Sequence, residues 1–414
     1  MGLASSHRVI PRFGTPGGLS PPQKIWVLFS IEIALNREVL YMRMFRISVA
    51  AASLGLLSAA GAALAADPPA ADAAPAAKPE LPAVSDLLTA SGITATGYVS
   101  GTFSYQTYSA SGVTAPSDYS TFTLQQAAFT LAKQPTTGFG ALVNVLAGQN
   151  IYTPNYGYAG VSKTPTQFQL VQAYAQYATG PVTIIAGKFL TLAGAEVVGS
   201  VGNTNITRSL LFTYEPITHT GVRLTYAASD TLSLIVGANN GWVYSDELAA
   251  SGGKTLEAGV AWTPSKAFSW TAQGYFGKDT NFAGVTSNHT LLDTVATWNA
   301  TAALSLVGSI DWGQVDKAFG VGTGSANWTG YAAYANYALS DQWRVSLRGE
   351  YFDDRDGYLT AVGPGVGQKL KEGTLTVGYD PAKNFELRLE GRYDTYDVNS
   401  VKVTQGWLEA LYKF

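Results

Sequence analysis

Ionisable side chains of both signs gather in one stretch in the middle of the chain, between residues 187 and 226. Acidic and basic groups that face one another across a narrow aqueous passage set a transverse field, which orients dipolar solutes and biases ion selectivity. Five residues between positions 187 and 226 are candidates for such a constriction: Lys188, Glu196, Arg208, His219 and Arg223.

Two of these candidates have alternative roles that the residues leave open. Glu196 and Arg208 could form a salt bridge that only braces the segment, and this role is compatible with a position in the pore. For His219, a hydrogen bond at the end of a strand is a more common role than titration in a channel.

A second set of charges alternates with apolar residues in the last third of the chain, over 343–351 and 384–394. Because successive side chains of a strand point to opposite faces, these charges share one face of each strand. The same alternation, through Val222, Leu224 and Tyr226, points Arg223 to that face. We expect a ladder of lumen-facing charges, opposed by carboxylates of the central stretch: Arg344, Arg348, Glu350, Glu386, Arg388, Glu390 and Arg392.

Patterns of catalytic and metal-binding residues are weak. After residue 65 the histidines are His219 and His289, which lie in separate segments and do not form a zinc ligand set. The chain has no cysteine, which excludes thiolate metal sites and a cysteine nucleophile. An acidic run at 353–356 is more typical of a solvated loop than of a divalent-ion site. We therefore expect no enzyme activity, no cofactor and no metal.

The composition indicates strands as the elements that position these charges. Hydrophobic residues make up 46% of the chain and aromatic residues 12%, whereas charged residues make up 13%. Yet after residue 65 no apolar run approaches the roughly 18 residues that a membrane-spanning helix needs. The net charge of −3 argues against a nucleic-acid-binding surface.

The N-terminal part divides into three segments before the folded region. Residues 1–41 show no consistent periodicity and are interpreted as an over-extended N-terminus. Residues 42–65 have a positively charged N-terminal region, an apolar stretch and a cleavage site with small residues, as in a secretory signal peptide. Residues 66–90 form a Pro/Ala-rich tether, so the fold is expected over 91–414.

Short turns and longer loops alternate between segments of strand character. An even number of strands, with short turns at one end and long loops at the other, is typical of a transmembrane antiparallel up-and-down β-barrel, whose short turns face the periplasm. We expect about 16 strands, near residues 93–109, 121–134, 139–149, 166–179, 182–189, 217–227, 231–240, 254–263, 267–278, 288–300, 303–315, 326–339, 342–353, 369–379, 384–396 and 401–414.

The last predicted strand ends on an aromatic residue, Phe414, with Tyr412 in the same phase. This end resembles the C-terminal signature of outer-membrane proteins that the barrel-assembly machinery recognises. An ordinary final strand is the alternative.

Residues 190–216 form the third loop on the long-loop side, which we expect to fold into the lumen. The sequences GKFLTLAGAEVV, NTNITRSLLF, THTGVRLTY and NNGW, between residues 187 and 242, resemble the signature region of the OmpL-like outer-membrane β-barrel porin family. The similarity extends from about residue 90 to the C-terminus. It implies a porin-like barrel and leaves the solute open.

The sequence thus predicts an outer-membrane porin for passive diffusion of small hydrophilic solutes and ions through a charged, loop-constricted lumen. The alternative is a structural or adhesive barrel with a closed lumen. Sixteen strands favour the first, since barrels of that size leave an aqueous channel. The expected location is the bacterial outer membrane, after export through a cleaved signal peptide. The expected partners are outer-membrane lipid and lipopolysaccharide, the barrel-assembly machinery and, by analogy, two further copies in a homotrimer.

Overall fold

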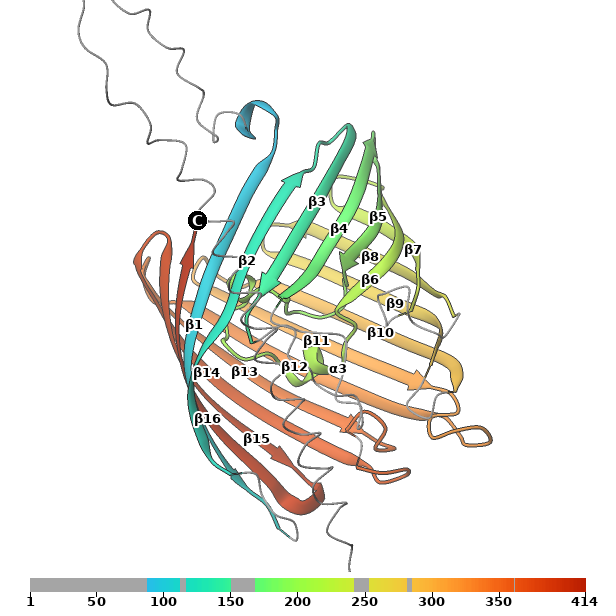
Figure 1. The fold of residues 1–414 in the computed structure, drawn as a ribbon, viewed down its shortest axis with the longest axis vertical. Helices are drawn as coiled ribbons and strands as arrows, with labels where there is room; N and C mark the ends of the chain where they lie inside the picture. The colour runs from blue at the N-terminus through green and yellow to red at the C-terminus, as the bar shows by residue number, and fades with distance from the viewer. Residues whose placement is uncertain (1–87, 112–116, 150–167, 242–252, 281–284, 361) are drawn as a thin grey trace, which may run out of the picture. The chain divides into compact units, whose positions relative to one another are not determined.

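The computed structural model describes residues 88–414 apart from 112–116, 150–167, 242–252, 281–284 and 361. The predicted extended N-terminus, the signal peptide and nearly all of the tether lie outside the described residues. Among the described residues, sixteen antiparallel strands form a closed barrel in which each strand pairs with its sequence neighbours and β1 pairs with β16 (Figure 1). The predicted sixteen-stranded barrel is confirmed.

The strands begin and end within a few residues of their predicted bounds. They are β1 (Thr94–Ser109), β2 (Tyr119–Lys133), β3 (Gly138–Ala147), β4 (Phe168–Thr179), β5 (Val182–Leu190), β6 (Thr218–Ala227), β7 (Leu232–Asn239), β8 (Thr255–Ser265), β9 (Phe268–Thr280), β10 (Thr286–Asn299), β11 (Leu304–Val315), β12 (Ala326–Ala338), β13 (Trp343–Asp354), β14 (Gln368–Ala382), β15 (Phe385–Tyr396) and β16 (Val401–Lys413). Between the strands, the described residues include the short helical elements η1 (Ser200–Gly202), α3 (Leu210–Tyr214) and η2 (Val398–Ser400).

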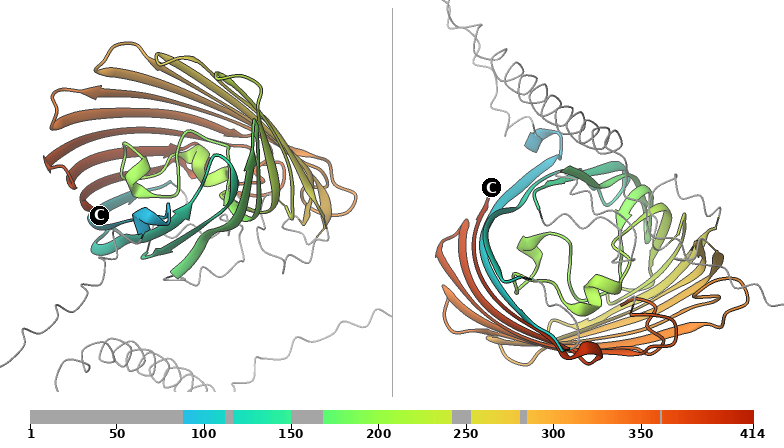
Figure 2. Two further views of the ribbon diagram at one scale, coloured as in Figure 1. Left: turned by 90° about the horizontal axis from the view of Figure 1, so that it is seen from above. Right: turned by 60° about the horizontal axis from the view of Figure 1, so that its bottom comes forward.

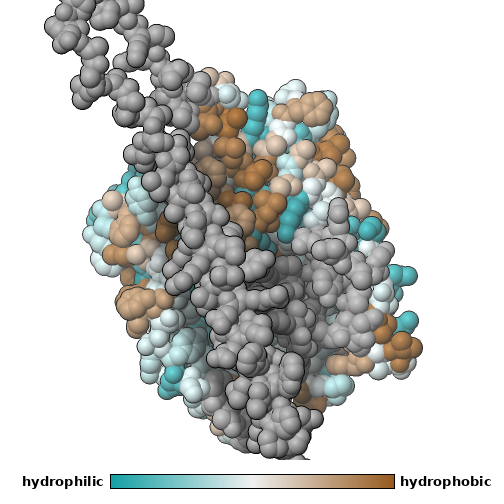
Figure 3. All heavy atoms as spheres, in the orientation of Figure 1, coloured by the Kyte–Doolittle hydropathy of each residue, from teal (hydrophilic) through white to brown (hydrophobic). Residues whose placement is uncertain are grey.

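The two faces of the sheet differ in the way that a membrane barrel requires. On β13 the side chain of Leu347 is 51% exposed, whereas Arg348 is 3% exposed, and on β15 Leu389 and Glu390 differ in the same sense. The outer face is therefore apolar and the inner face polar, as expected for strands that alternate between lipid and lumen. Figure 3 shows hydrophobic residues in brown over the outside of the strands, interspersed with hydrophilic ones.

Aromatic side chains pair at the short-turn end of the strands. Trp343 stacks on Tyr379 of the neighbouring strand with ring centroids 4.4 Å apart, and Phe139 lies 4.8 Å from Tyr177. Such pairs match the aromatic girdle that borders the apolar band of a membrane barrel. No helix in the described part of the chain has the length and apolar character to cross a membrane.

The chain terminus closes the barrel. The Phe414 amide donates to the Gly97 carbonyl and the Gly97 amide donates to the Phe414 carbonyl, both at 2.9 Å. Position 97 leaves no room for a side chain, because a Cβ on Gly97 would lie 2.5 Å from the Phe414 ring. Phe414 and Tyr412 both remain exposed on the outer face.

Candidate functional site

The longest excursion between described strands is residues 191–217, named here the β5–β6 segment. It contains η1 and α3, and both views of Figure 2 show it in green, surrounded by the strands. Ser209 starts α3, because its hydroxyl accepts a hydrogen bond from the Phe212 amide at 3.0 Å and so satisfies a donor that the first turn leaves unpaired.

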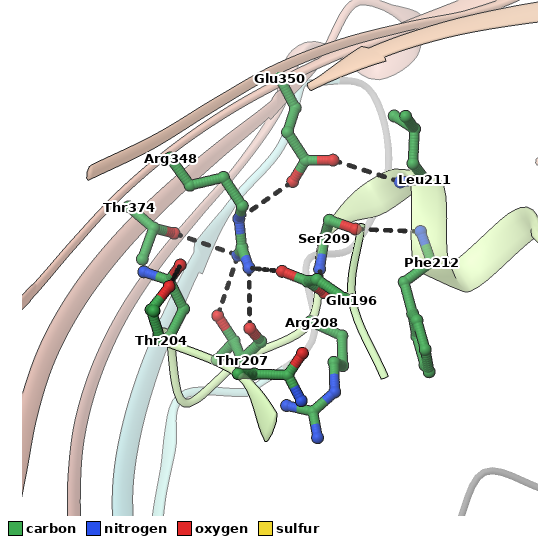
Figure 4. Close-up of polar contacts among 12 residues, drawn as sticks. Glu196, Thr204, Thr207, Arg208, Ser209, Leu211, Phe212, Arg348, Glu350 and Thr374 are labelled. Atoms are coloured by element: carbon green, nitrogen blue, oxygen red, sulfur yellow. Dashed lines mark hydrogen bonds and ion pairs between the residues drawn. The ribbon is translucent and has the colours of Figure 1, made fainter. Parts of the chain in front are cut away.

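Arg348, which is 3% exposed on β13, lies at the centre of the contact between this segment and the barrel wall. Its guanidinium forms an ion pair with Glu196 of the segment at 2.8 Å and donates to the Thr207 carbonyl at 2.8 Å (Figure 4). On the wall it pairs with Glu350 and with Glu372, each at 3.2 Å. One buried cation thus joins two wall carboxylates to a carboxylate of the segment.

The other three arginines of the predicted ladder contact the segment in the same way. Arg344, Arg388 and Arg392 donate to backbone carbonyls of the segment, at 2.7 Å to Thr204, 3.1 Å to Ser200 and 2.5 Å to Arg208, respectively. Together with Arg348, each ladder arginine therefore donates to one carbonyl oxygen of the β5–β6 segment.

Each of these arginines also has a carboxylate partner on the wall. Arg344 and Arg388 share Glu386, Arg388 also lies 3.3 Å from Glu409, and Arg392 pairs with Asp394 at 2.7 Å. The predicted ladder shares the inner face, and Arg348 lies opposite a carboxylate of the segment, Glu196, as the sequence suggested. The structure adds that all four arginines also pair with carboxylates of the wall itself.

Glu390 accepts hydrogen bonds from the segment directly. The Ile206 and Thr207 amides donate to its carboxylate at 2.6 and 2.9 Å, and the Thr207 hydroxyl donates at 2.6 Å. These three bonds satisfy acceptors of a carboxylate that is 1% exposed. The segment is consequently held by acceptors as well as donors of the wall.

Glu196 and Arg208 are positioned differently from the salt bridge that the sequence suggests. Glu196 pairs with Arg348 and accepts from the Ser209 amide at 2.7 Å. The Arg208 side chain donates to three carbonyls of the segment itself, those of Val197, Val198 and Ile206. Arg208 therefore shapes the segment, whereas Glu196 connects it to β13.

Arg223 and His219 lie on the inner face of β6, away from the four arginines in sequence. Arg223 forms a buried ion pair with Glu257 of β8, and its guanidinium lies over the Phe189 ring, 4.4 Å from the centroid. The His219 ring stacks on Tyr275 at 4.9 Å, and its Nδ1 lies 3.3 Å from the Gly241 carbonyl oxygen. The contact with the Gly241 carbonyl corresponds to the hydrogen bond at a strand end that the sequence suggested for His219.

Lys188 lies outside this site. The register pairs Lys188 with Thr220, whereas Ile185 pairs with Arg223 and Ala186 with Val222. Lys188 therefore shares its face with Val222, which is 49% exposed on the outer surface. The prediction that Lys188 lines the constriction is therefore wrong. Successive residues of a strand face opposite sides, so Lys188 faces outward although its neighbour Phe189 pairs with the inward-facing His219.

Apolar side chains hold the segment to two parts of the inner wall. Leu210 and Leu211 of α3 belong to a buried cluster with Trp328, Phe352 and Tyr358. A second buried cluster joins three residues of the segment to the first strands: Val198, Phe212 and Ile217 pack with Tyr98, Ala128, Leu146 and Val171. The segment thus packs through apolar side chains against β12 and β13 and also against the first four strands, β1 to β4.

The end of the segment also meets two wall carboxyl groups. Glu215, Asp293 of β10 and Asp311 of β11 are buried, with oxygen atoms within 4.8 Å of one another, a spacing that could admit one cation. Burial raises the pKa of Glu215 well above its usual value, and the nearby Asp293 raises it further. A protonated Glu215 can lie beside the other two carboxyl groups without an added charge.

Sequence reasoning did not name the acidic partners of the arginines that follow, although one of them, Asp394, lies in the predicted charged run 384–394. Glu257, Glu372, Asp394 and Glu409 all lie on the inner face and form the ion pairs described above. The signal was available, because each has the phase of an inward-facing residue in a predicted strand or beside a recognised charge. For Glu257, Glu372 and Glu409 the missing information was the pairing between strands, whereas Asp394 lies on the same strand as Arg392.

Comparison with solved structures supports the fold. The outer-membrane channel DcaP of Acinetobacter baumannii matches with a TM-score of 0.56 at 15% identity, covering 78% of this chain and 97% of that one. Pseudomonas putida OprB matches with a TM-score of 0.55 at 11% identity over 80% and 96%. An anion-selective porin from Comamonas acidovorans matches with a TM-score of 0.54 at 11% identity over 78% and 99%.

No curated protein sequence matches this chain. The family model described as beta-barrel porin-2, OmpL-like, matches residues 92–407, which include the inner-face charges described above apart from Glu409. The chain belongs to the OmpL-like family of outer-membrane β-barrel porins.

Proposed function

We propose that this protein is an outer-membrane porin through which small hydrophilic solutes and ions diffuse passively. Family membership and the porin folds of the structural neighbours support this function. A sixteen-stranded barrel is also wide enough to leave an aqueous channel. Transport, rather than catalysis, is therefore the proposed function.

The contact between four wall arginines and the β5–β6 segment carries the proposal. Arg344, Arg348, Arg388 and Arg392 each donate to a carbonyl of the segment. A segment held in this way narrows the passage, so solutes are selected first by size. The Arg223–Glu257 pair then supplies opposite charges on another part of the inner wall.

One observation favours the alternative of a closed barrel. Apolar clusters attach the segment both to β12 and β13, through Leu211, and to the first strands, through Phe212. Such a bridge could leave no continuous path for water. The structural or adhesive barrel therefore stays as the second candidate.

We propose a homotrimer in the bacterial outer membrane. The support is by analogy, since one structural neighbour, OmpT of Vibrio cholerae, is described in a trimer form. Outer-membrane lipid, lipopolysaccharide and the barrel-assembly machinery are the other proposed partners.

Single-channel recording in planar bilayers tests the function. The purified protein should give stepwise, ohmic openings, and shortening the β5–β6 segment to a Gly/Ser linker should increase their size. Lys188→Gln is the matched control, because Lys188 lies on the outer face and its loss should leave conductance unchanged. Silence of the folded wild-type protein, with openings only after the segment is shortened, would instead support the closed barrel.

A further inference from the structure

Two lysines lie directly beside one another on the outer face of the barrel, at the long-loop end of β8 and β9. Thr255 pairs with Gly277, so Lys254 lies next to Lys278, and the Lys278 amide donates to the Lys254 carbonyl at 3.2 Å. Both side chains are exposed. They share the phase of Leu256 and Phe276, which are 61% and 44% exposed on the outer face.

Like charges on directly opposed positions of two strands repel one another and destabilise the pair. An anion between them removes this repulsion. The two lysines line a pocket of about 630 Å³ with the polar side chains of Asn288, Gln314 and Asp316. The pocket therefore has the size and the donors for a phosphorylated group.

The acidic residue of the pocket, Asp316, accepts hydrogen bonds from neighbouring side chains. The Asp316 carboxylate accepts from Asn288 at 3.0 Å, from Gln314 at 3.0 Å and from the Ser325 hydroxyl at 2.9 Å. The hydrogen bond from Asn288, with those from Gln314 and Ser325, lowers the pKa of Asp316, so it stays ionised. Two lysines against one carboxylate leave the described side chains of this pocket with an excess of positive charge.

An apolar groove continues from the pocket along the outer face. It has a volume of about 670 Å³, shares Phe276 with the pocket, and is lined by Ala258, Gly274, Leu292 and Trp312. The register orders these residues as a row below the pocket, since Ala258 pairs with Gly274 and Leu292 with Trp312. The groove is open to the lipid side, because Leu292 is 44% exposed.

The depth of the lysines matches the edge of the apolar band. On β8 the outer-face side chains run from Lys254 through Leu256, Ala258 and Val260 to Trp262. At about 3.4 Å per residue this row is roughly 27 Å long, and with a strand tilt of about 40° it rises roughly 21 Å along the membrane normal, close to the ~25 Å height of the apolar band of such barrels. Lys254 and Lys278 therefore lie at headgroup depth, with the groove at the depth of the acyl chains.

We propose that this surface binds a phosphorylated, acylated glycolipid of the outer leaflet, with a phosphate between Lys254 and Lys278 and an acyl chain in the groove. Charge complementarity and the continuity of the dibasic pocket with an apolar groove select an amphiphile over a free anion. The inference rests on the proposed outer-membrane location and orientation. It does not depend on an open channel.

Binding of purified diphosphorylated lipid A to the folded protein in detergent tests the proposal, with native mass spectrometry as the readout. Lys254→Gln with Lys278→Gln should weaken binding at least tenfold, whereas Lys278→Arg should retain it. Lys402→Gln is the matched control, since Lys402 is an exposed lysine of β16 that lies opposite Thr395 and Ser109 rather than another lysine. Ala258→Trp should weaken binding by filling the groove.

Three results would overturn the proposal. Equal binding of dephosphorylated lipid A would show that the lysines do not recognise the phosphate. Full competition by inorganic phosphate would show that the pocket binds simple anions and not a lipid. Loss of an oligomer in the double variant, with lipid binding unchanged, would make this surface a subunit interface. Heat-modifiable electrophoretic mobility checks the fold of each variant, and conductance, recorded in parallel, separates a failure here from a failure of the proposed channel.

Discussion

At the scale of single residues, buried ion pairs hold a segment rather than line an open passage. Arg348 contacts Glu196, Glu350 and Glu372, and its side chain has no exposed surface. A buried arginine with several carboxylate partners contributes little net stability compared with apolar residues, yet its loss leaves uncompensated charges. The arrangement therefore specifies where the β5–β6 segment lies more than it adds to stability.

Arg348→Gln should destabilise the folded barrel by about 3–5 kcal/mol, because three buried carboxylates lose their shared cation. Release of the segment should also give larger or noisier single-channel currents. Thermal unfolding followed by circular dichroism and bilayer recording measure the two effects. Arg355→Gln, at an exposed arginine, is the control and should change neither. Wild-type stability and currents in Arg348→Gln would show that the pairs are dispensable.

At the scale of elements, α3 connects the segment to the wall through apolar contact. Leu211 is 1% exposed and belongs to the cluster that contains Trp328 and Phe352. Gly330 of β12 makes room for it, since a Cβ at Gly330 would lie 2.9 Å from the Leu211 side chain. A short helix of five residues has little stability of its own, so this packing determines that it forms.

Leu211→Ala should lower the free energy of unfolding by about 2–5 kcal/mol, as expected for a buried leucine that leaves a cavity. The measurement is the midpoint of heat-induced unfolding in detergent. Thr213→Ala, on the exposed side of the same helix, should have a much smaller effect. Equal effects of the two substitutions would show that α3 is not packed against the wall.

At the scale of the whole molecule, closure depends on the two strands that are farthest apart in the sequence, β1 and β16. β1 and β16 pair from Tyr98 with Lys413 to Ser109 with Lys402, and Phe414 extends this ladder to Gly97. Phe414 itself is 59% exposed, so it buries little surface against the barrel. Its role is therefore expected in assembly rather than in the stability of the finished fold.

Removal of Phe414 should reduce the amount of folded protein in the outer membrane several-fold, with a small change in the unfolding midpoint of the molecules that do fold. Quantitative immunoblotting of heat-modifiable protein in membrane fractions measures the first effect. Phe414→Tyr keeps the terminal aromatic ring and should assemble normally. Wild-type yields after removal would show that the C-terminus is an ordinary strand end.

The sequence alone determined the strands, their faces and the end at which long loops lie. These properties follow from the two-residue period of side chains and from turn residues, both of which are local. The inward phase of Arg223, Arg348 and Glu390 could therefore be predicted, as could a sixteen-stranded barrel. The face of Lys188 was predicted wrongly, because its position near the end of a strand does not reveal its register with the neighbouring strand.

Only the tertiary structure decided which charges meet. Glu196 and Arg348 are 152 positions apart in the chain, and Glu390 and Ile206 are 184 apart. Such pairs depend on the path of the β5–β6 segment, which is set by the packing of Leu211 and Phe212 against different strands. Local periodicity carries no information about that path. The charges could thus be assigned to a face from the sequence, but their partners could not.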